Sequence, residues 1–319
     1  MQFERFLENA NFILTEGSIY ERLRRNPLVE FDPDLAHAAL IYNDKGSEIL
    51  AQIHREYIEI GQKYQLPMVV LTNTWRANKE RINRSKFRDF KINQDNVNFI
   101  FELCRPYRNS HNPIFIGGVI GPRGDAYKPD LSINIDTAES FHSDQLLALL
   151  ETQIDFLMAA TLPALSEALG IARAMAVAKI PYFLSFVIRK NGRLLDGTPL
   201  DQAIEKIDTN TPVSPTGYFV NCVHPKVLLS AFDAVGIQKG NLAERIVGFQ
   251  ANTSPKSPEE LDGIEELESE DPEIFGSLML EVYEKYRMPI LGGCCGTDAR
   301  HMESLAKKLK GISVLRYKV

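Results

Sequence analysis

The sequence is short of cysteine, with four in 319 residues, and no apolar run approaches the roughly 18 residues of a membrane-spanning helix. The first scarcity argues against a disulfide-stapled fold, and the second against an integral membrane protein. The first five residues already include Glu4 and Arg5, where a secretory signal peptide requires a continuous apolar stretch. We therefore expect a cytoplasmic protein with no membrane partner, in which clustered cysteines indicate metal binding or catalysis.

An excess of positive charge is also absent, since the formal net charge is −6 and the sequence pI is near 5.6. No basic cluster overrides this balance, so we expect no nucleic-acid partner. Hydrophobic residues make up 44% of the chain and charged residues 24%. This composition is that of an ordinary globular protein with a full apolar core.

Short apolar runs rich in Val, Ile, Leu and Phe recur along the whole chain, and such runs are typical of parallel strands buried on both faces. We predict strands at Asn11–Gly17, Pro67–Trp75, Pro113–Gly121, Ile154–Thr161, Pro181–Ile188, Tyr218–Val223, Arg245–Asn252 and Met288–Cys294. The segments between them show the apolar spacing of helices. Examples are Ser47–Tyr64, Asn96–Tyr107, Ala164–Ala178, Pro225–Val235 and Glu273–Arg287.

Eight strand–helix units over this length predict an α/β fold, a (β/α)8 TIM barrel that forms a single domain over residues 1–319. A doubly wound sheet would show the same alternation, but no GxGxxG turn follows the first strand. Two long segments, Pro122–Thr137 and the acidic Ser254–Asp271, should lie at the C-terminal face of the barrel, where loops build active sites. We expect the acidic segment to be partly helical and exposed.

Three of the four cysteines fall at the carboxyl ends of two predicted strands. Cys222 ends the sixth strand, and Cys294 and Cys295 end the eighth. These strand ends share one rim of a barrel, so the three sulfurs can converge. Neighbouring strand residues point to opposite faces, so the backbone must leave strand geometry for both residues of the pair to bind one ion. Glycines at positions 292, 293 and 296 make that departure sterically easy.

Three thiolates form an incomplete tetrahedral site, and an open fourth position is typical of catalytic zinc. Sulfur ligands favour zinc over magnesium or calcium, and a substrate thiol that binds the metal is deprotonated. The alternatives for the Cys294–Cys295 pair are a vicinal disulfide or two unrelated thiols. We expect Cys104, in a predicted helix, to be a core residue. His224 is a conceivable fourth ligand, but a surface or loop histidine is the favoured interpretation.

The hexapeptide Gly292–Thr297, together with Asn221-Cys222, resembles the homocysteine S-methyltransferase family. Weaker likenesses to the motifs of that family occur in the right order at Ile13–Ser18, Thr72–Asn78, Gly117–Asp125, Ser185-Phe186 and Gly192–Thr198. The resemblance implies a barrel that binds Zn²⁺ through Cys222, Cys294 and Cys295, with homocysteine as the methyl acceptor. It also implies substrate contacts, which we place at Glu16, Gly17, Thr161 and Asn221.

The chain departs from the family pattern at two acidic positions that bind the amino group of homocysteine. Glu16 replaces the usual Asp, and Ala160 replaces the Glu of a Glu-Thr-x-Pro motif. A charge-assisted hydrogen bond contributes about 1.5–3 kcal/mol, so its loss would weaken homocysteine binding by roughly one or two orders of magnitude. Either Glu16 compensates, or the acceptor is a different small thiol. Glu16 could also be an ordinary strand-end charge that faces solvent.

For the methyl donor, the simplest expectation is a sulfonium compound, S-methylmethionine or S-adenosylmethionine. The chain has no Asp-x-His-x-x-Gly segment of the kind that marks a cobalamin-binding module. A corrinoid donor would therefore have to arrive on a separate protein. A further alternative is that the chain binds zinc and a partner protein, for instance a corrinoid protein, and has no catalytic activity alone. The exposed acidic segment would then be the surface that contacts the partner.

Overall fold

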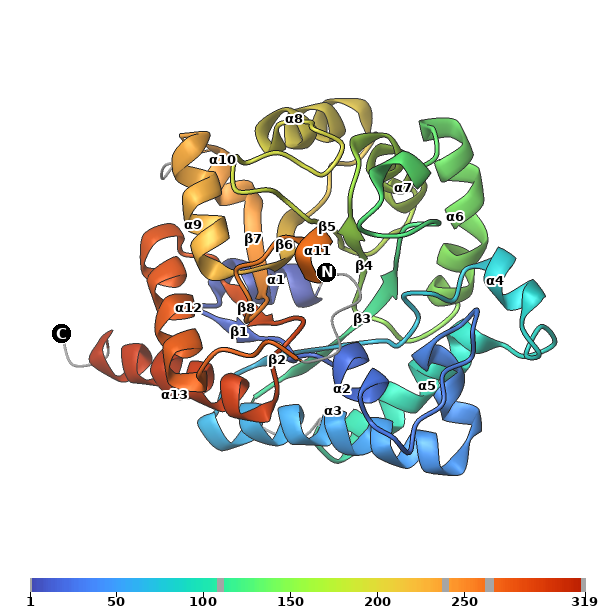
Figure 1. The fold of residues 1–319 in the computed structure, drawn as a ribbon, viewed down its shortest axis with the longest axis horizontal. Helices are drawn as coiled ribbons and strands as arrows, with labels where there is room; N and C mark the ends of the chain where they lie inside the picture. The colour runs from blue at the N-terminus through green and yellow to red at the C-terminus, as the bar shows by residue number, and fades with distance from the viewer. Residues whose placement is uncertain (1, 108–111, 237–240, 262–266, 317–319) are drawn as a thin grey trace.

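In the computed structural model, which describes residues 2–107, 112–236, 241–261 and 267–316, eight strands form a closed barrel in the order β1 to β8. Every strand pair is parallel, and β8 returns to β1. Most of the helices form an outer ring around the strands (Figure 1). The fold is the single-domain TIM barrel that the sequence predicts. Residues 1, 108–111, 237–240, 262–266 and 317–319 of the predicted domain lie outside the described residues.

All eight predicted strands are present, most of them shorter than predicted. They are β1 Ile13–Leu14, β2 Met68–Leu71, β3 Ile114–Ile120, β4 Phe156–Leu162, β5 Tyr182–Phe186, β6 Gly217–Val223, β7 Ile246–Ala251 and β8 Ile290–Gly293. The largest error at a strand end is in β2, which was predicted to continue to Trp75 but ends at Leu71. There the Thr72 hydroxyl accepts the N–H of Val119 (2.9 Å) and bonds the Thr74 hydroxyl (2.7 Å). The side-chain hydroxyl of Thr72 thus takes the place of the next backbone acceptor between β2 and β3.

The helices alternate with the strands as predicted. They are α1 Gln2–Asn9, α2 Tyr20–Arg24, α3 Asp44–Tyr64, α4 Lys79–Arg84, α5 Ile92–Cys104, α6 Ile135–Leu150, α7 Leu165–Ala176, α8 Leu200–Asn210, α9 Pro225–Ala234, α10 Asn241–Arg245, α11 Pro258–Leu261, α12 Pro272–Tyr286 and α13 Ala299–Arg316. Cys104, on α5, is fully buried, as expected.

The interior of the barrel is filled by side chains, and it is separate from the larger core between strands and helices. Phe156 belongs to the interior cluster and its neighbour Leu157 to the outer one. Burial on both faces explains why the strands read as continuous apolar runs. Phe3 of α1 stacks against Phe156 and contacts Phe115, with ring centroids 4.7 and 4.8 Å apart. This helix therefore packs against the interior cluster.

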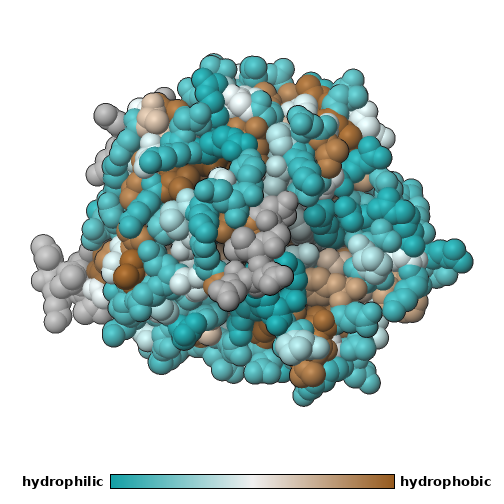
Figure 2. All heavy atoms as spheres, in the orientation of Figure 1, coloured by the Kyte–Doolittle hydropathy of each residue, from teal (hydrophilic) through white to brown (hydrophobic). Residues whose placement is uncertain are grey.

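Hydrophilic residues cover most of the face shown in Figure 2, and apolar residues appear there only in small separate patches. Among the described residues, no helix is both long enough and apolar enough to cross a membrane.

Gly117 tests how tightly the barrel interior is filled. A Cβ at this position would lie 2.5 Å from Cζ of Phe156 and 2.7 Å from Cδ2 of Leu71. We expect Gly117→Ala to lower the free energy of unfolding by about 1–3 kcal/mol, because overpacking forces neighbours from their rotamers. Urea unfolding measures the change. Gly311→Ala on α13 is the matched control, since a Cβ there meets nothing within 4 Å. Equal effects at both sites would contradict the interior packing.

Candidate metal centre

The three cysteines predicted as metal ligands come together at one rim of the barrel. Sγ of Cys222 in β6 lies 2.6 Å from Sγ of Cys294, which follows β8, and the three Sγ atoms all lie within 4.8 Å of one another. Sulfurs about 2.3 Å from one tetrahedral zinc ion would stand about 3.8 Å apart. The three sulfurs are therefore near enough to share one ion, and the Cys222–Cys294 pair would have to separate by about 1 Å to bind it. All four cysteines are free in this structure, so Cys294 and Cys295 form no vicinal disulfide in it.

Two strands carry irregularities that shape this rim. Cys222 has φ +56° and Thr161 has φ +64°, and the strand register shifts next to each of them. A non-glycine residue in this left-handed region costs on the order of 1–3 kcal/mol, so the surrounding structure holds both residues in place. The sequence gives no sign of this strain.

The glycines around the cysteine pair act in two ways, only one of which was predicted. Gly296 has φ +85° and allows the sharp turn that follows Cys295. Gly292 and Gly293 are not left-handed; a Cβ at either would collide with the Thr15 or the Thr297 side chain. Their role is close packing.

Electrostatic coupling within the cluster favours one ionised thiol. Hydrogen bonds donated by Cys294 and then Cys295 lower the pKa of Cys222. Interaction with Cys222 in turn raises the pKa of Cys294 and Cys295. Burial, together with the nearby sulfurs, raises the pKa of Tyr127, whose hydroxyl bonds Cys222. Tyr127 lies in the long segment after β3, and its position beside the sulfurs was not predicted.

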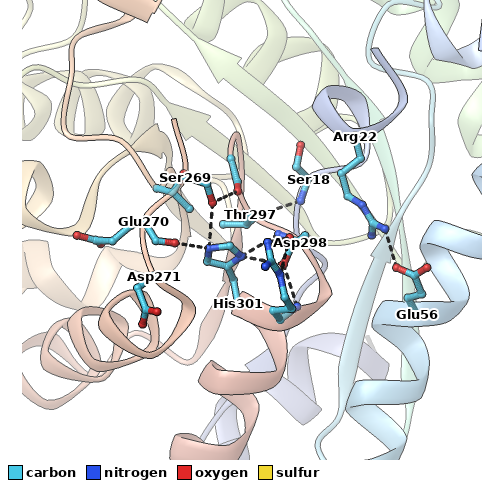
Figure 3. Close-up of polar contacts among 12 residues, drawn as sticks. Ser18, Arg22, Glu56, Ser269, Glu270, Asp271, Thr297, Asp298 and His301 are labelled. Atoms are coloured by element: carbon cyan, nitrogen blue, oxygen red, sulfur yellow. Dashed lines mark hydrogen bonds and ion pairs between the residues drawn. The ribbon is translucent and has the colours of Figure 1, made fainter. Parts of the chain in front are cut away.

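A network of hydrogen bonds holds the loop that carries Cys294 and Cys295. His301, fully buried on α13, contacts the Glu270 carbonyl (2.9 Å) and the Ser269 hydroxyl (3.3 Å) from the segment after β7 (Figure 3). Thr297 donates to the Cys294 carbonyl (2.6 Å) and accepts the N–H of Ser18 (3.0 Å). The loop is thus tied to the chain after β1 and after β7.

A cavity of about 340 Å³ opens beside the sulfurs. It is lined by all three clustered cysteines and by the four residues predicted to contact substrate, Glu16, Gly17, Thr161 and Asn221. Asn221 donates to the Thr161 hydroxyl (2.8 Å) and accepts from the Ser185 hydroxyl (2.6 Å). These two predicted contact residues are therefore already fixed to each other.

Glu16 does not face solvent, because it is only 3% exposed. One carboxylate oxygen lies 2.5 Å from Nδ1 of His54, and the other accepts the N–H of Leu71 (3.0 Å). Nε2 of His54 lies 3.2 Å from the Asn73 side-chain oxygen. Both ring nitrogens of His54 thus face oxygen atoms, and the Glu16 carboxylate already has a close side-chain partner.

His224 is a loop histidine, in the connection between β6 and α9, but it is buried and does not lie at the surface. It is 1% exposed and stands at the start of α9, where Nδ1 accepts the N–H of Lys226 (3.2 Å). Its Nε2 lies 3.1 Å from the Glu270 carboxylate. Because both nitrogens have other partners, His224 supplies no fourth ligand in this structure.

The acidic segment after β7 is partly helical, in α11, and most of its described residues are exposed, as predicted. Ser254 is buried, and Leu261, Leu267 and Glu268 line a smaller cavity of about 220 Å³ together with Cys222 and Cys295. Residues 262–266 of this segment lie outside the described residues.

Comparison with known proteins identifies the family to which this chain belongs. A sequence profile of the homocysteine S-methyltransferase family matches residues 13–309. The chain belongs to this family. Homocysteine S-methyltransferase of Escherichia coli is 22% identical over 94% of this chain and 96% of its own length. Betaine–homocysteine S-methyltransferase 1 of Bos taurus is also 22% identical, over 95% of this chain and 73% of its own.

Solved structures support the fold. The metallated form of the homocysteine methyltransferase MmuM from Escherichia coli superposes with a TM-score of 0.72 at 18% identity, covering 95% of this chain and 98% of that one. Its oxidised form gives a TM-score of 0.71 at 19% identity, covering 95% of this chain and 97% of that one.

The metal site can be tested without an activity assay. We expect Cys294→Ser to lose bound zinc during dialysis against a chelator, because a hydroxyl is a poor replacement for a soft thiolate ligand. Elemental analysis of the dialysed protein gives the metal content per chain. Cys104→Ser makes the same chemical change on α5 and should keep the metal. Full zinc retention by Cys294→Ser would remove this residue from the ligand set.

Proposed function

We propose that this chain is a zinc-dependent methyltransferase that converts homocysteine to methionine. Membership of the homocysteine S-methyltransferase family supports the reaction class. The observation that carries the proposal is the convergence of Cys222, Cys294 and Cys295 beside a cavity that can admit a small substrate. When bound by these sulfurs, zinc would offer an open coordination position at which a substrate thiol loses its proton.

The reaction needs little more from the protein than alignment of two reactants. The substrate sulfur forms a bond to the methyl carbon of the donor, and the donor sulfur keeps the electron pair of the broken bond. The thiol proton leaves to solvent. The bonds of Asn221 to Thr161 and of Thr297 to the cysteine loop fix the walls against which the reactants are held.

For the donor we propose a sulfonium compound, S-methylmethionine or S-adenosylmethionine. The aromatic side chains of Tyr20 and Tyr127 line both cavities next to the sulfurs. Aromatic faces attract cations through their quadrupole, so this surrounding suits a positively charged methyl donor. A methyl group delivered by a separate corrinoid protein is the alternative that the donor assay decides.

We also propose that the protein acts in the cytoplasm, where its four free cysteines would stay reduced.

The direct test supplies zinc-loaded protein with ¹³C-labelled homocysteine and each sulfonium donor in turn. Labelled methionine, measured by mass spectrometry, should form with at least one donor. Cys294→Ser should form none, and Cys104→Ser should match the unchanged protein. If no labelled methionine forms with either sulfonium donor but does form with a methylated corrinoid protein, the donor assignment is wrong. No methionine with any donor would remove the proposal.

A further inference from the structure

The cavity beside the sulfurs contains a cation that has no carboxylate partner. Arg76, just after β2, lines this cavity and is half-buried. Its guanidinium forms no ion pair with any carboxylate of the described residues, and it donates a hydrogen bond to the Gly124 carbonyl (2.8 Å). Burial and the nearby Arg81 lower the pKa of Arg76 more than the charge of Asp125, which forms no ion pair with it, raises it. A guanidinium has five N–H donors, and most of them remain available.

The position of this guanidinium is fixed by the residues around it. It lies 4.4 Å above the ring of Trp75. The indole N–H of Trp75 donates to the Ala160 carbonyl (3.0 Å), which anchors the ring to β4. Gly121 leaves room for the ring, since a Cβ there would lie 2.5 Å from the indole nitrogen. These contacts hold the guanidinium against the ring, and its remaining donors stay available to a ligand in the cavity.

A second donor of the cavity is also unused. The side-chain nitrogen of Asn73, a residue that is 2% exposed, has no hydrogen-bond partner among the described residues. Asn73 lines the same cavity, and its oxygen is held by His54. A buried polar group without a partner costs free energy unless a ligand satisfies it. Two sets of free donors therefore call for a ligand group that accepts hydrogen bonds.

The carboxylates of the cavity, in contrast, already have donors. Glu16 is paired with His54 and the Leu71 N–H, and Glu21 accepts two bonds of 3.0 Å from Arg24. One carboxylate oxygen of Asp125 accepts the N–H of Tyr127 (2.8 Å), and the charge of Asp125 acts on the nearby Arg76. Position 160 has only the methyl group of an alanine. The cavity is thus better equipped for an anionic group than for an ammonium group.

We propose that Arg76 binds a carboxylate of the acceptor thiol, and that an amino group on that thiol contributes little to binding. The substrate class is then the small thiol carboxylates, which includes homocysteine but does not require its amine. This inference rests on the proposed function for the thiol position at the sulfurs. It assigns the specificity for the rest of the acceptor to Arg76 and Asn73.

Three thiols with the same chain length separate the two groups. Homocysteine carries both the carboxylate and the amine, 4-mercaptobutanoate only the carboxylate, and 3-aminopropane-1-thiol only the amine. Calorimetric titration of the zinc-loaded protein without donor gives the affinity of each. We expect 4-mercaptobutanoate to bind within about threefold of homocysteine, and 3-aminopropane-1-thiol about 10- to 100-fold more weakly, the range of one charge-assisted bond.

Variants of Arg76 locate the effect. Arg76→Gln should weaken both carboxylate thiols about 10- to 100-fold and leave 3-aminopropane-1-thiol unchanged. Arg76→Lys should fall between, because it keeps the charge and loses the planar fork. Arg84→Gln, which removes a charge that pairs with Asp34 and Glu80 at the surface, should change nothing. Bound zinc and urea unfolding, measured on each variant, show whether the fold is intact.

Ala160→Glu offers a gain of function. A carboxylate at this position would face the cavity, so we expect homocysteine to become at least about tenfold tighter than 4-mercaptobutanoate in this variant. An unchanged ratio would contradict the idea that the cavity lacks an amine acceptor.

The inference is overturned if homocysteine binds at least tenfold more tightly than 4-mercaptobutanoate to the unchanged protein, or if Arg76→Gln leaves both affinities as they were. If that amine preference disappears in Asp125→Asn, Asp125 is the amine acceptor that the inference denies. Amine-dependent binding with methionine formation would leave the proposed function standing. Arg76-dependent binding without methyl transfer to any thiol would remove the proposed function and leave this inference.

Discussion

The meeting of sulfurs from two separated strands is the constraint on which the site depends. Cys222 and Cys294 are 72 positions apart, and the strand order of the barrel brings β6 and β8 to either side of β7. Strand order alone does not bring the three sulfurs together. The left-handed backbone at Cys222 and the turn at Gly296 give the side chains their final directions. The site therefore stores local strain that the barrel, as a rigid scaffold, compensates.

The fold also decides which charged side chains of the cavity are available to a ligand. Some of them already have a partner within the protein, and others do not. Glu16 is the obvious candidate to bind an ammonium group when the sequence is considered alone. In the fold it is occupied by His54, which comes from α3. Arg76 is the reverse case, because it is an inconspicuous residue in the sequence and the least compensated cation of the cavity. In our proposal, the preference for one acceptor thiol over another depends on which charged side chains lack a partner in the protein, and not simply on which charged residues are present.

Much of the fold could be predicted from the sequence because parallel strands buried on both faces leave a strong apolar pattern. The cluster at Cys222, Cys294 and Cys295 was predictable for a related reason, since strand order fixes which residues share a rim. What could not be predicted depends on side chains that meet across the fold. Tyr127 beside Cys222, His54 on Glu16 and the buried His224 are examples, and none has a local sequence signal.

The most direct measurement is X-ray absorption at the zinc edge of the loaded protein. Three sulfur neighbours at about 2.3 Å with one lighter neighbour are expected before substrate is added, and four sulfurs after homocysteine is added. Two or fewer protein sulfurs, or a sulfur number that does not rise with homocysteine, would contradict the account.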